Sequence, residues 1–247
     1  MLMIYQEITA RLEEICKRIP REQAEYIKQY LTNAPYWVIE TMQLVKKDKN
    51  VVFIEENTPA DNVYILLEGS IRAVDYRVKG FAFDYMRLDG VNIVGSMECY
   101  FRIPDYMTTL VTTTPCTFLI ISRKNYEKWI WDDKNALQMD VASMGAYLME
   151  QTRVNRLFLF LQGTDRFLYM FAKNYEKSQS KGDYCLDMSR QELAERSGFS
   201  IKTVNRSVKK MEEDGFISRK GHKIIISRKQ YEMMKEYLDD ILDQTNG

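Results

Sequence analysis

The sequence has little of what catalysis and covalent cross-linking require. Its 247 residues include one histidine and four cysteines. A nucleophile–histidine–acid set could draw only on His222, and no glycine-rich phosphate loop is present, so an enzyme is not expected. The cysteines, at positions 16, 99, 116 and 185, form no C-x-x-C pair and no tight cluster. This spacing favours free thiols and predicts neither a metal site nor a cofactor.

Long hydrophobic runs are also missing. No stretch approaches eighteen uninterrupted apolar residues, so we expect no transmembrane span and no membrane partner. The first residues, MLMIYQEITARLEE, become charged too early for a signal peptide, which indicates a cytoplasmic protein. Hydrophobic residues make up 45% of the chain and aromatic residues 12%, enough for packed cores. The length fits one large domain or two ordinary ones.

The formal net charge is zero, but charge is unevenly distributed. Residues 188–229 hold 11 Lys and Arg against 5 Asp and Glu, whereas residues 230–247 hold 1 against 5. The remaining residues, 1–187, hold 23 against 25. Positive charge concentrated on one module is typical of phosphate binding.

That basic module has the pattern of a helix-turn-helix with a two-stranded wing. Ser189 and Glu192 form an S-x-x-E capping box at the start of one helix. Gly198 ends that helix, and Ser200 can cap the next. The wing is predicted from strand-like residues on either side of a turn, 216–219 and 223–226.

The second helix has two distinct faces. Val204, Val208 and Met211 form its buried stripe. Another face carries hydrogen-bond donors and no carboxylate, which suits the major groove of DNA. We assign base contacts on it to Ile201, Lys202, Asn205 and Arg206. We assign phosphate contacts to Ser189, Arg190, Ser200, Thr203 and Lys209. An ordinary helical hairpin is the less favoured alternative.

The segments SRQELA at 189–194, GFS at 198–200 and TVNR at 203–206 resemble the winged helix of the cyclic-AMP receptor protein and fumarate-nitrate regulator (Crp/Fnr) superfamily. The resemblance implies a homodimeric bacterial transcription regulator with an N-terminal sensor barrel. Its partner would be double-stranded DNA with a near-palindromic operator, and RNA polymerase is a further candidate. In the family, glutamate is common where this chain has Lys202.

The same resemblance implies an α+β fold in three parts. Residues 1–131 would form N-terminal helices and a cyclic-nucleotide-binding-like β jelly roll, 132–162 a dimerisation helix, and 163–247 the winged helix with a C-terminal helix. Short strand-like segments spaced along residues 49–121 agree with a barrel. Residues 4–18 and 21–31 are predicted helices that pack on it. Residues 36–45 fit helix or strand.

Residues 95–108 correspond to the effector segment of the family. There a glycine-glutamate pair binds the ribose, and an arginine followed by a small hydroxyl residue binds the phosphate. Here Ser96 follows Gly95, and Tyr106 and Met107 stand near the arginine and hydroxyl positions. We therefore expect an unknown small-molecule effector other than cyclic AMP, since buried phosphate without a cation is costly.

The candidate effector pocket is rich in aromatic residues. It comprises Phe83, Tyr85, Met97, Glu98, Tyr100, Arg102 and Tyr106. Glu98 and Arg102 leave a shifted nucleotide site open. The alternative that most of these aromatic residues are plain core carries more weight, because alternation along one strand already explains several of them.

The long predicted helix over 132–161 shows the 4,3 spacing of a coiled-coil seam. We assign the dimer interface to Leu137, Val141, Met144, Leu148, Gln151 and Asn155. A helix packed along its own barrel is the alternative, and the two are compatible. The acidic helix predicted over 228–242 would pack on the winged helix or on a partner subunit.

Three functions remain open at this point. The leading one is a ligand-responsive dimeric regulator. The second is a constitutive DNA-binding regulator whose barrel is a ligand-free scaffold. The third is a redox-sensing or gas-sensing family member. This function has little support, because Cys16 is the one N-terminal cysteine and the single histidine, His222, is in the wing turn.

Overall fold

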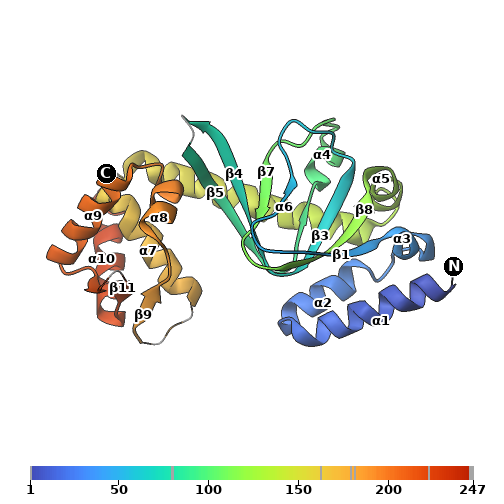
Figure 1. Ribbon diagram of the computed structural model, residues 1–247, viewed down its shortest axis with the longest axis horizontal. Coiled ribbons are helices and arrows are strands. Elements are labelled where there is room, and N and C mark those ends of the chain that lie inside the picture. Colours follow the sequence, from blue (N-terminus) through green and yellow to red (C-terminus); the bar gives the residue numbers. More distant parts are fainter. Residues whose placement is uncertain are drawn as a thin grey trace. The chain divides into compact units, whose positions relative to one another are not determined.

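The computed structural model describes the backbone of residues 2–78, 81–161, 163–178, 180, 182–221 and 223–244. Within these ranges the side chains of 2–5, 11, 76–78, 81–85, 153–160 and 242–244 are not described. The chain divides into two compact units, residues 1–148 and 149–247, which share the long helix α6 (Lys134–Phe160). Figure 1 labels the elements of both.

The first unit contains a barrel-like pair of antiparallel four-stranded sheets. One sheet has the order β1-β8-β3-β6 and the other β2-β7-β4-β5. The strands are β1 (Gln43–Lys47), β2 (Val52–Ile54), β3 (Asn62–Glu68), β4 (Ser70–Val78), β5 (Phe81–Asp89), β6 (Asn92–Val94), β7 (Thr109–Thr112) and β8 (Cys116–Ser122). Residues 36–45, which fitted helix or strand, divide into a short helix and the start of β1.

Strand β3 shows how the first unit builds its core. Five successive residues of β3 are buried, because both faces of the strand are covered. The odd positions, such as Ile65, join the cluster that includes the N-terminal helices, and the even positions, such as Leu66, join the barrel interior. The covering helices are α1 (Leu2–Arg18), α2 (Arg21–Tyr30), α3 (Tyr36–Thr41) and α5 (Arg123–Ile130).

The turn from β6 into the short helix α4 (Ser96–Tyr100) depends on Gly95. Its φ is +87°, and a Cβ there would lie 2.7 Å from the carbonyl oxygen of Asn62. Glycine is therefore the residue this turn requires. α4 follows at once and places Ser96 and Glu98 against the barrel.

The second unit is a winged helix. It consists of α7 (Thr164–Ser178), β9 (Tyr184–Leu186), α8 (Arg190–Ser197), α9 (Ile201–Glu213), β10 (Ser218–Lys220), β11 (Lys223–Ile226) and α10 (Arg228–Gln244). The three strands form one antiparallel sheet of order β10-β11-β9. The α+β fold class predicted from the sequence is confirmed.

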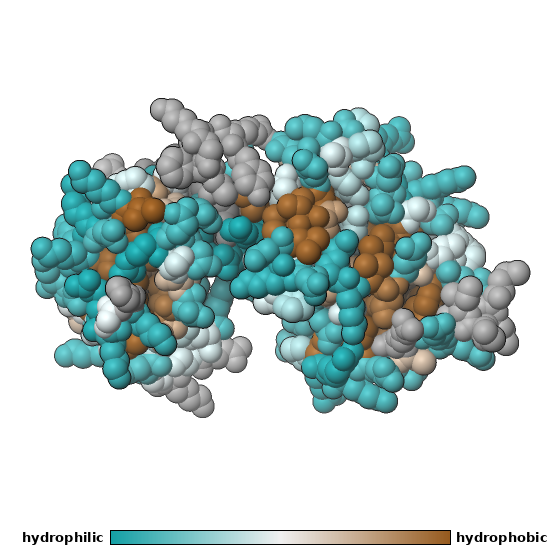
Figure 2. Space-filling model, in the orientation of Figure 1, coloured by the Kyte–Doolittle hydropathy of each residue, from teal (hydrophilic) through white to brown (hydrophobic). Residues whose placement is uncertain are grey.

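The C-terminal helix α10 packs within its own unit. The rings of Tyr175 on α7 and Tyr231 on α10 stack with centroids 4.6 Å apart, and Met234 and Leu238 are buried in the same core. None of the described helices is long and apolar enough to span a membrane. On the face drawn in Figure 2, hydrophilic residues cover most of each unit.

Candidate DNA-binding interface and barrel cavity

Local hydrogen bonds fix both helices of the helix-turn-helix at their starts. The Ser189 hydroxyl oxygen accepts from the Glu192 backbone N–H at 3.1 Å, and the Glu192 carboxylate accepts from the Ser189 N–H at 2.8 Å. Gly198 ends α8 with φ +69°. Ser200 caps α9 by accepting from the Thr203 N–H at 3.2 Å. The capping box read from the sequence is present, so the start of each helix is fixed by local hydrogen bonds.

Helix α9 presents a buried face and an exposed face. Val204, Ser207, Val208 and Met211 are buried against the rest of the unit. On the other side, the predicted base-contacting residues Ile201, Lys202, Asn205 and Arg206 are all exposed, as is Lys209. Spacings of three and four residues bring Lys202, Asn205, Arg206 and Lys209 onto one surface. The side chains of that surface offer hydrogen-bond donors to an approaching ligand. A carboxylate is paired with them: Glu213 lies 3.5 Å from the Lys209 ammonium.

The guanidinium of Arg190, where α8 begins, is close enough to that of Arg219 on β10 to feel its charge. Burial and the nearby charge of Arg219 lower the pKa of Arg190. Among the described residues, no hydrogen bond or ion pair engages the Arg190 side chain, whereas Arg219 donates to Glu212 at 2.6 Å. A phosphate would relieve the repulsion between the two cations. Sequence reasoning missed Arg219, although its place in a basic wing was a usable signal.

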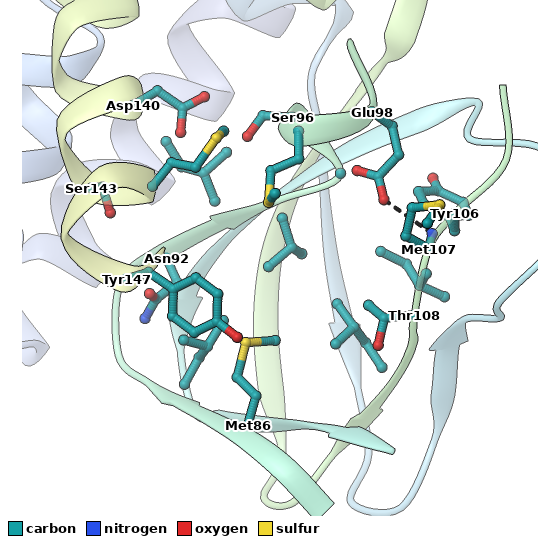
Figure 3. A pocket seen from close by; sticks show the side chains of 18 of the residues that line it. Met86, Asn92, Ser96, Glu98, Tyr106, Met107, Thr108, Asp140, Ser143 and Tyr147 are labelled. Atoms are coloured by element: carbon teal, nitrogen blue, oxygen red, sulfur yellow. Dashed lines mark hydrogen bonds between the residues drawn. The ribbon is translucent and has the colours of Figure 1, made fainter. Parts of the chain in front are cut away.

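The first unit contains a cavity of about 260 Å³ between the barrel and α6. This lies just below the roughly 300–1,000 Å³ usual for ligand sites. Apolar side chains supply much of its lining: Ile54, Met86, Leu88, Ile93, Val94, Met97, Ile103, Met107, Leu110 and Met144. Figure 3 shows Ser96 and Glu98 reaching in from α4, and Asp140, Ser143 and Tyr147 from α6. None of the described lining residues is Arg, Lys or His.

The predicted pocket residues divide into three groups. Met97, Glu98 and Tyr106 line the cavity. Tyr100 and Arg102 do not: the Tyr100 hydroxyl turns towards Asp140, and Arg102 is exposed in the turn after α4. The side chains of Phe83 and Tyr85 lie outside those that the structure describes.

Tyr106 stands at the position expected for a phosphate-binding arginine, but its hydroxyl is hydrogen-bonded within the barrel wall. Its hydroxyl donates to the Asn62 carbonyl oxygen at 2.7 Å and accepts from the Asn62 N–H at 3.1 Å. A tyrosine hydroxyl has one proton, so Tyr106 has no donor left for a phosphate. Burial, the largest effect, raises the pKa of Tyr106, so the phenol stays neutral.

Asp140 anchors a buried network that sequence reasoning missed. One of its oxygens accepts from the Tyr126 hydroxyl at 2.5 Å and from the Tyr100 hydroxyl at 2.8 Å, and Tyr30 lies 3.1 Å from Tyr126. Burial raises the pKa of Asp140, although hydrogen bonds from Tyr126, Tyr100 and Ser96 oppose this. The sequence offered one sign of this network: Asp140 lies off the predicted coiled-coil seam of the long helix, so it was free to face the barrel.

Helix α6 uses part of the predicted seam within its own unit. Leu137 packs partly on the first core, and Met144 lines the cavity. Val141 and Leu148 are 49% and 42% exposed. Gln151 is half-buried, and the Asn155 side chain lies outside those described. The long helix therefore combines an inward face with exposed apolar positions.

Three of the four thiols are poorly suited to redox chemistry. Burial raises the pKa of Cys99 to about 12 and also raises that of Cys116 and Cys16. A thiolate is the reactive form, so these groups are kept unreactive. Cys185 is exposed on β9. Within the described part of the chain, no cluster of three His, Cys, Asp or Glu side chains could hold a metal ion.

A basic winged helix joined to a β-barrel with an internal cavity defines a class of protein, the DNA-binding regulators built on a sensor-type barrel. A sequence model of the family described as Crp-like helix-turn-helix domain matches residues 153–231. The chain is 22% identical over 193 residues to the cAMP-activated global transcriptional regulator CRP of Haemophilus influenzae, covering 77% of this chain and 86% of that protein. It is 24% identical over 176 residues to the CRP-like protein Clp of Xanthomonas axonopodis pv. citri, covering 68% and 76%.

Solved structures share the fold. The c-di-GMP responsive global regulator CLP of Xanthomonas campestris superposes with a TM-score of 0.68 at 21% identity, over 82% of this chain and 98% of that one. A CRP/FNR-family transcriptional regulator from Thermus thermophilus gives 0.66 at 17% identity, over 80% and 98%. These similarities support membership of the Crp/Fnr superfamily of transcription regulators, with a Crp-like helix-turn-helix DNA-binding domain at residues 153–231.

Proposed function

We propose that the protein works as a homodimer that binds a near-palindromic operator and responds to a small molecule, other than cyclic AMP, held in the barrel cavity. The observation that carries the DNA-binding part is the exposed donor face of α9, where Lys202, Asn205, Arg206 and Lys209 lie together. This face matches the acceptor-rich major groove.

The base contacts follow from the chemistry of each side chain. Arg206 suits a guanine, whose O6 and N7 accept two hydrogen bonds. Lys202 can only donate, so it also seeks acceptors, with guanine again the best partner. Asn205 fits adenine or the DNA backbone, and Ile201 offers apolar contact. The operator therefore differs from that of relatives with glutamate at this position, since a carboxylate prefers the cytosine amino group.

The phosphate contacts come from the helix starts and the wing. The Ser189 hydroxyl accepts from a backbone N–H group, which leaves its proton available for a phosphate oxygen. The Ser200 hydroxyl also accepts from a backbone N–H and lies 3.0 Å from the Thr203 hydroxyl, so one proton of this hydroxyl pair is available. Thr203 stands beside Ser200 and Lys209 one turn beyond Asn205. Arg190 supplies a guanidinium that no described carboxylate engages.

The proposed dimer uses the exposed positions of α6. Val141 and Leu148 lie seven residues apart and present apolar surface that a second copy of the helix would cover. A two-fold dimer places two α9 helices about one DNA turn apart, roughly 34 Å, which accounts for a near-palindromic site.

The proposed effector differs from the ligands named for the relatives. A cyclic nucleotide carries a phosphate, and the cavity presents Glu98 and Asp140 with no described cationic lining residue. Burying an anion beside carboxylates is strongly unfavourable. The cAMP activation of the relatives is therefore not carried over.

Selection of binding sites from random DNA tests the reading face. Lys202→Glu should change the preferred base pair at one position per half-site by about 1–3 kcal/mol and leave the Arg206 guanine unchanged. Lys235→Glu, an exposed lysine on α10, is the control and should select the wild-type motif. Identical motifs from wild type and Lys202→Glu would place Lys202 on phosphate instead.

A further inference from the structure

The cavity holds two buried carboxylates in a largely apolar wall. Glu98 is 6% exposed and Asp140 2%. Within the described lining no Arg, Lys or His faces them. Ionised groups are rarely buried without a partner of opposite charge, because leaving water is costly. The partner is therefore to be sought in what the cavity binds.

Arg123 donates to groups other than the Glu98 carboxylate. Arg123 is on α5, and its guanidinium donates to the Glu127 carboxylate at 2.8 Å. Its two remaining nitrogens donate to the carbonyl oxygens of Ile103 at 2.6 Å and Glu98 at 3.0 Å. Arg123 thus braces the backbone of α4. Among the described residues the Glu98 carboxylate forms no ion pair, although the charge of Arg123 acts on it at longer range.

The two carboxylates differ in how many hydrogen bonds they accept. Asp140 accepts from two tyrosine hydroxyls, and Ser96 adds a third donor. Glu98 has a single protein donor, the Met107 backbone N–H at 3.2 Å from Oε1, and its Oε2 accepts from none of the described residues. Figure 3 shows the Glu98 carboxylate reaching from α4 to the Met107 edge of the cavity. Glu98 is consequently the side chain with acceptor capacity left for a ligand.

We propose that the cavity binds a small apolar molecule bearing an ammonium group, with the ammonium on Glu98 and the apolar part against the methionine-rich wall. An ammonium supplies three donors and the missing positive charge. Met86, Met97, Met107 and Met144 adapt to the shape of the apolar part. The inference rests on the proposed function only in taking the cavity as the effector site.

Isothermal titration calorimetry on the full-length protein with two matched probe series tests the charge preference. One series is 2-phenylethylamine, 2-phenylethanol and 3-phenylpropionate, and the other is hexylamine, hexanol and hexanoate. We expect each amine to bind at least about tenfold more tightly than its alcohol, and the carboxylates and cyclic AMP to give no saturable heat. Equal affinity of amine and alcohol, tighter binding of a carboxylate or of cyclic AMP, or no binding by either amine would overturn the proposal.

A pair of variants locates the ammonium. Glu98→Gln keeps the size of the side chain and should weaken amine binding at least about tenfold while leaving alcohol binding unchanged. Glu55→Gln, an exposed carboxylate outside the cavity, is the matched control and should bind like wild type. Unchanged amine affinity in Glu98→Gln would refute the assignment. Operator binding without probe is measured alongside, so that failure of the ligand class is distinguished from failure of DNA binding.

Discussion

Replacing Tyr126 by phenylalanine removes the hydroxyl at the centre of the buried network, which lies 3.1 Å from the hydroxyls of both Tyr30 and Tyr100. The Tyr126 hydroxyl is fully buried and donates to Asp140 at 2.5 Å. Phenylalanine keeps the ring, including its edge contact with Trp129 at 5.9 Å between centroids, and removes only the hydroxyl. The perturbation therefore concerns the buried hydrogen-bond network rather than packing, and its pH-dependent part comes from Asp140.

The expected cost depends on the charge of Asp140. A hydrogen bond to an ionised group contributes about 1.5–3 kcal/mol and a neutral one about 0.5–1.5 kcal/mol. At a pH where Asp140 is ionised, Tyr126→Phe should lower the free energy of unfolding of the first unit by the larger amount. With about 2–4 °C per kcal/mol for a domain of this size, the melting temperature should fall by about 3–12 °C.

The sign of the pH dependence follows from the raised pKa of Asp140. Between its unfolded and folded pKa values the folded state binds more protons, so Asp140 destabilises the fold increasingly as the pH rises through this window. Removing one of its donors raises the folded pKa further. The difference between Tyr126→Phe and wild type should therefore shrink as the pH falls towards 4 and Asp140 becomes protonated in both.

Urea unfolding followed by tryptophan fluorescence measures this effect in the right unit, because Trp37, Trp129 and Trp131 all belong to residues 1–148. Tyr64→Phe is the control: its hydroxyl donates to a neutral carbonyl at 3.4 Å, so its cost should not change with pH. In an Asp140→Asn background Tyr126→Phe should cost about 0.5–1.5 kcal/mol. A pH-independent cost, or the full cost in that background, would refute the reasoning.

Three further predictions concern the proposed function. Arg190→Ala should weaken binding to all DNA sequences about equally and lower the salt slope by about one unit, measured by fluorescence anisotropy at several salt concentrations; a changed sequence preference would place Arg190 in the groove. Val141→Glu with Leu148→Glu should give monomers by light scattering and abolish tight operator binding, and variants that stay dimeric would exclude this interface. Titration of the wild-type protein with cyclic GMP should give no heat at micromolar ligand, whereas saturable binding would show that a shifted site accepts the phosphate.

The winged helix could be predicted closely from the sequence because its signals are local. The capping box at Ser189, the turn at Gly198 and the buried stripe beginning at Val204 each involve residues three or four apart. The structure confirms these elements, and the exposed face of α9 follows from the same periodicity. The charge interaction of Arg190 with Arg219 was not foreseen, since these residues are far apart in the sequence.

The cavity could not be predicted to the same degree. Met97, Glu98 and Tyr106 were found through the family resemblance, but Tyr100, the last residue of α4, and Arg102, in the turn after it, do not line the cavity. A five-residue helix such as α4 changes direction by about 100° per residue, so single positions decide between wall and solvent. Asp140, Ser143 and Tyr147 come from a distant segment, and no local pattern links that segment to the barrel.

Helix α6 gives the cavity a physical route to the proposed dimer interface. Asp140, Ser143 and Tyr147 face the cavity, whereas Val141 and Leu148 are exposed about 80–100° around the helix from Asp140 and further from Ser143 and Tyr147. Met144 lies between these two faces. Because the faces adjoin, a ligand that displaces the cavity side of α6 also changes the angle at which the exposed side meets a second copy. If ligand and operator favour different settings of this helix, each must alter the affinity of the other by the same factor.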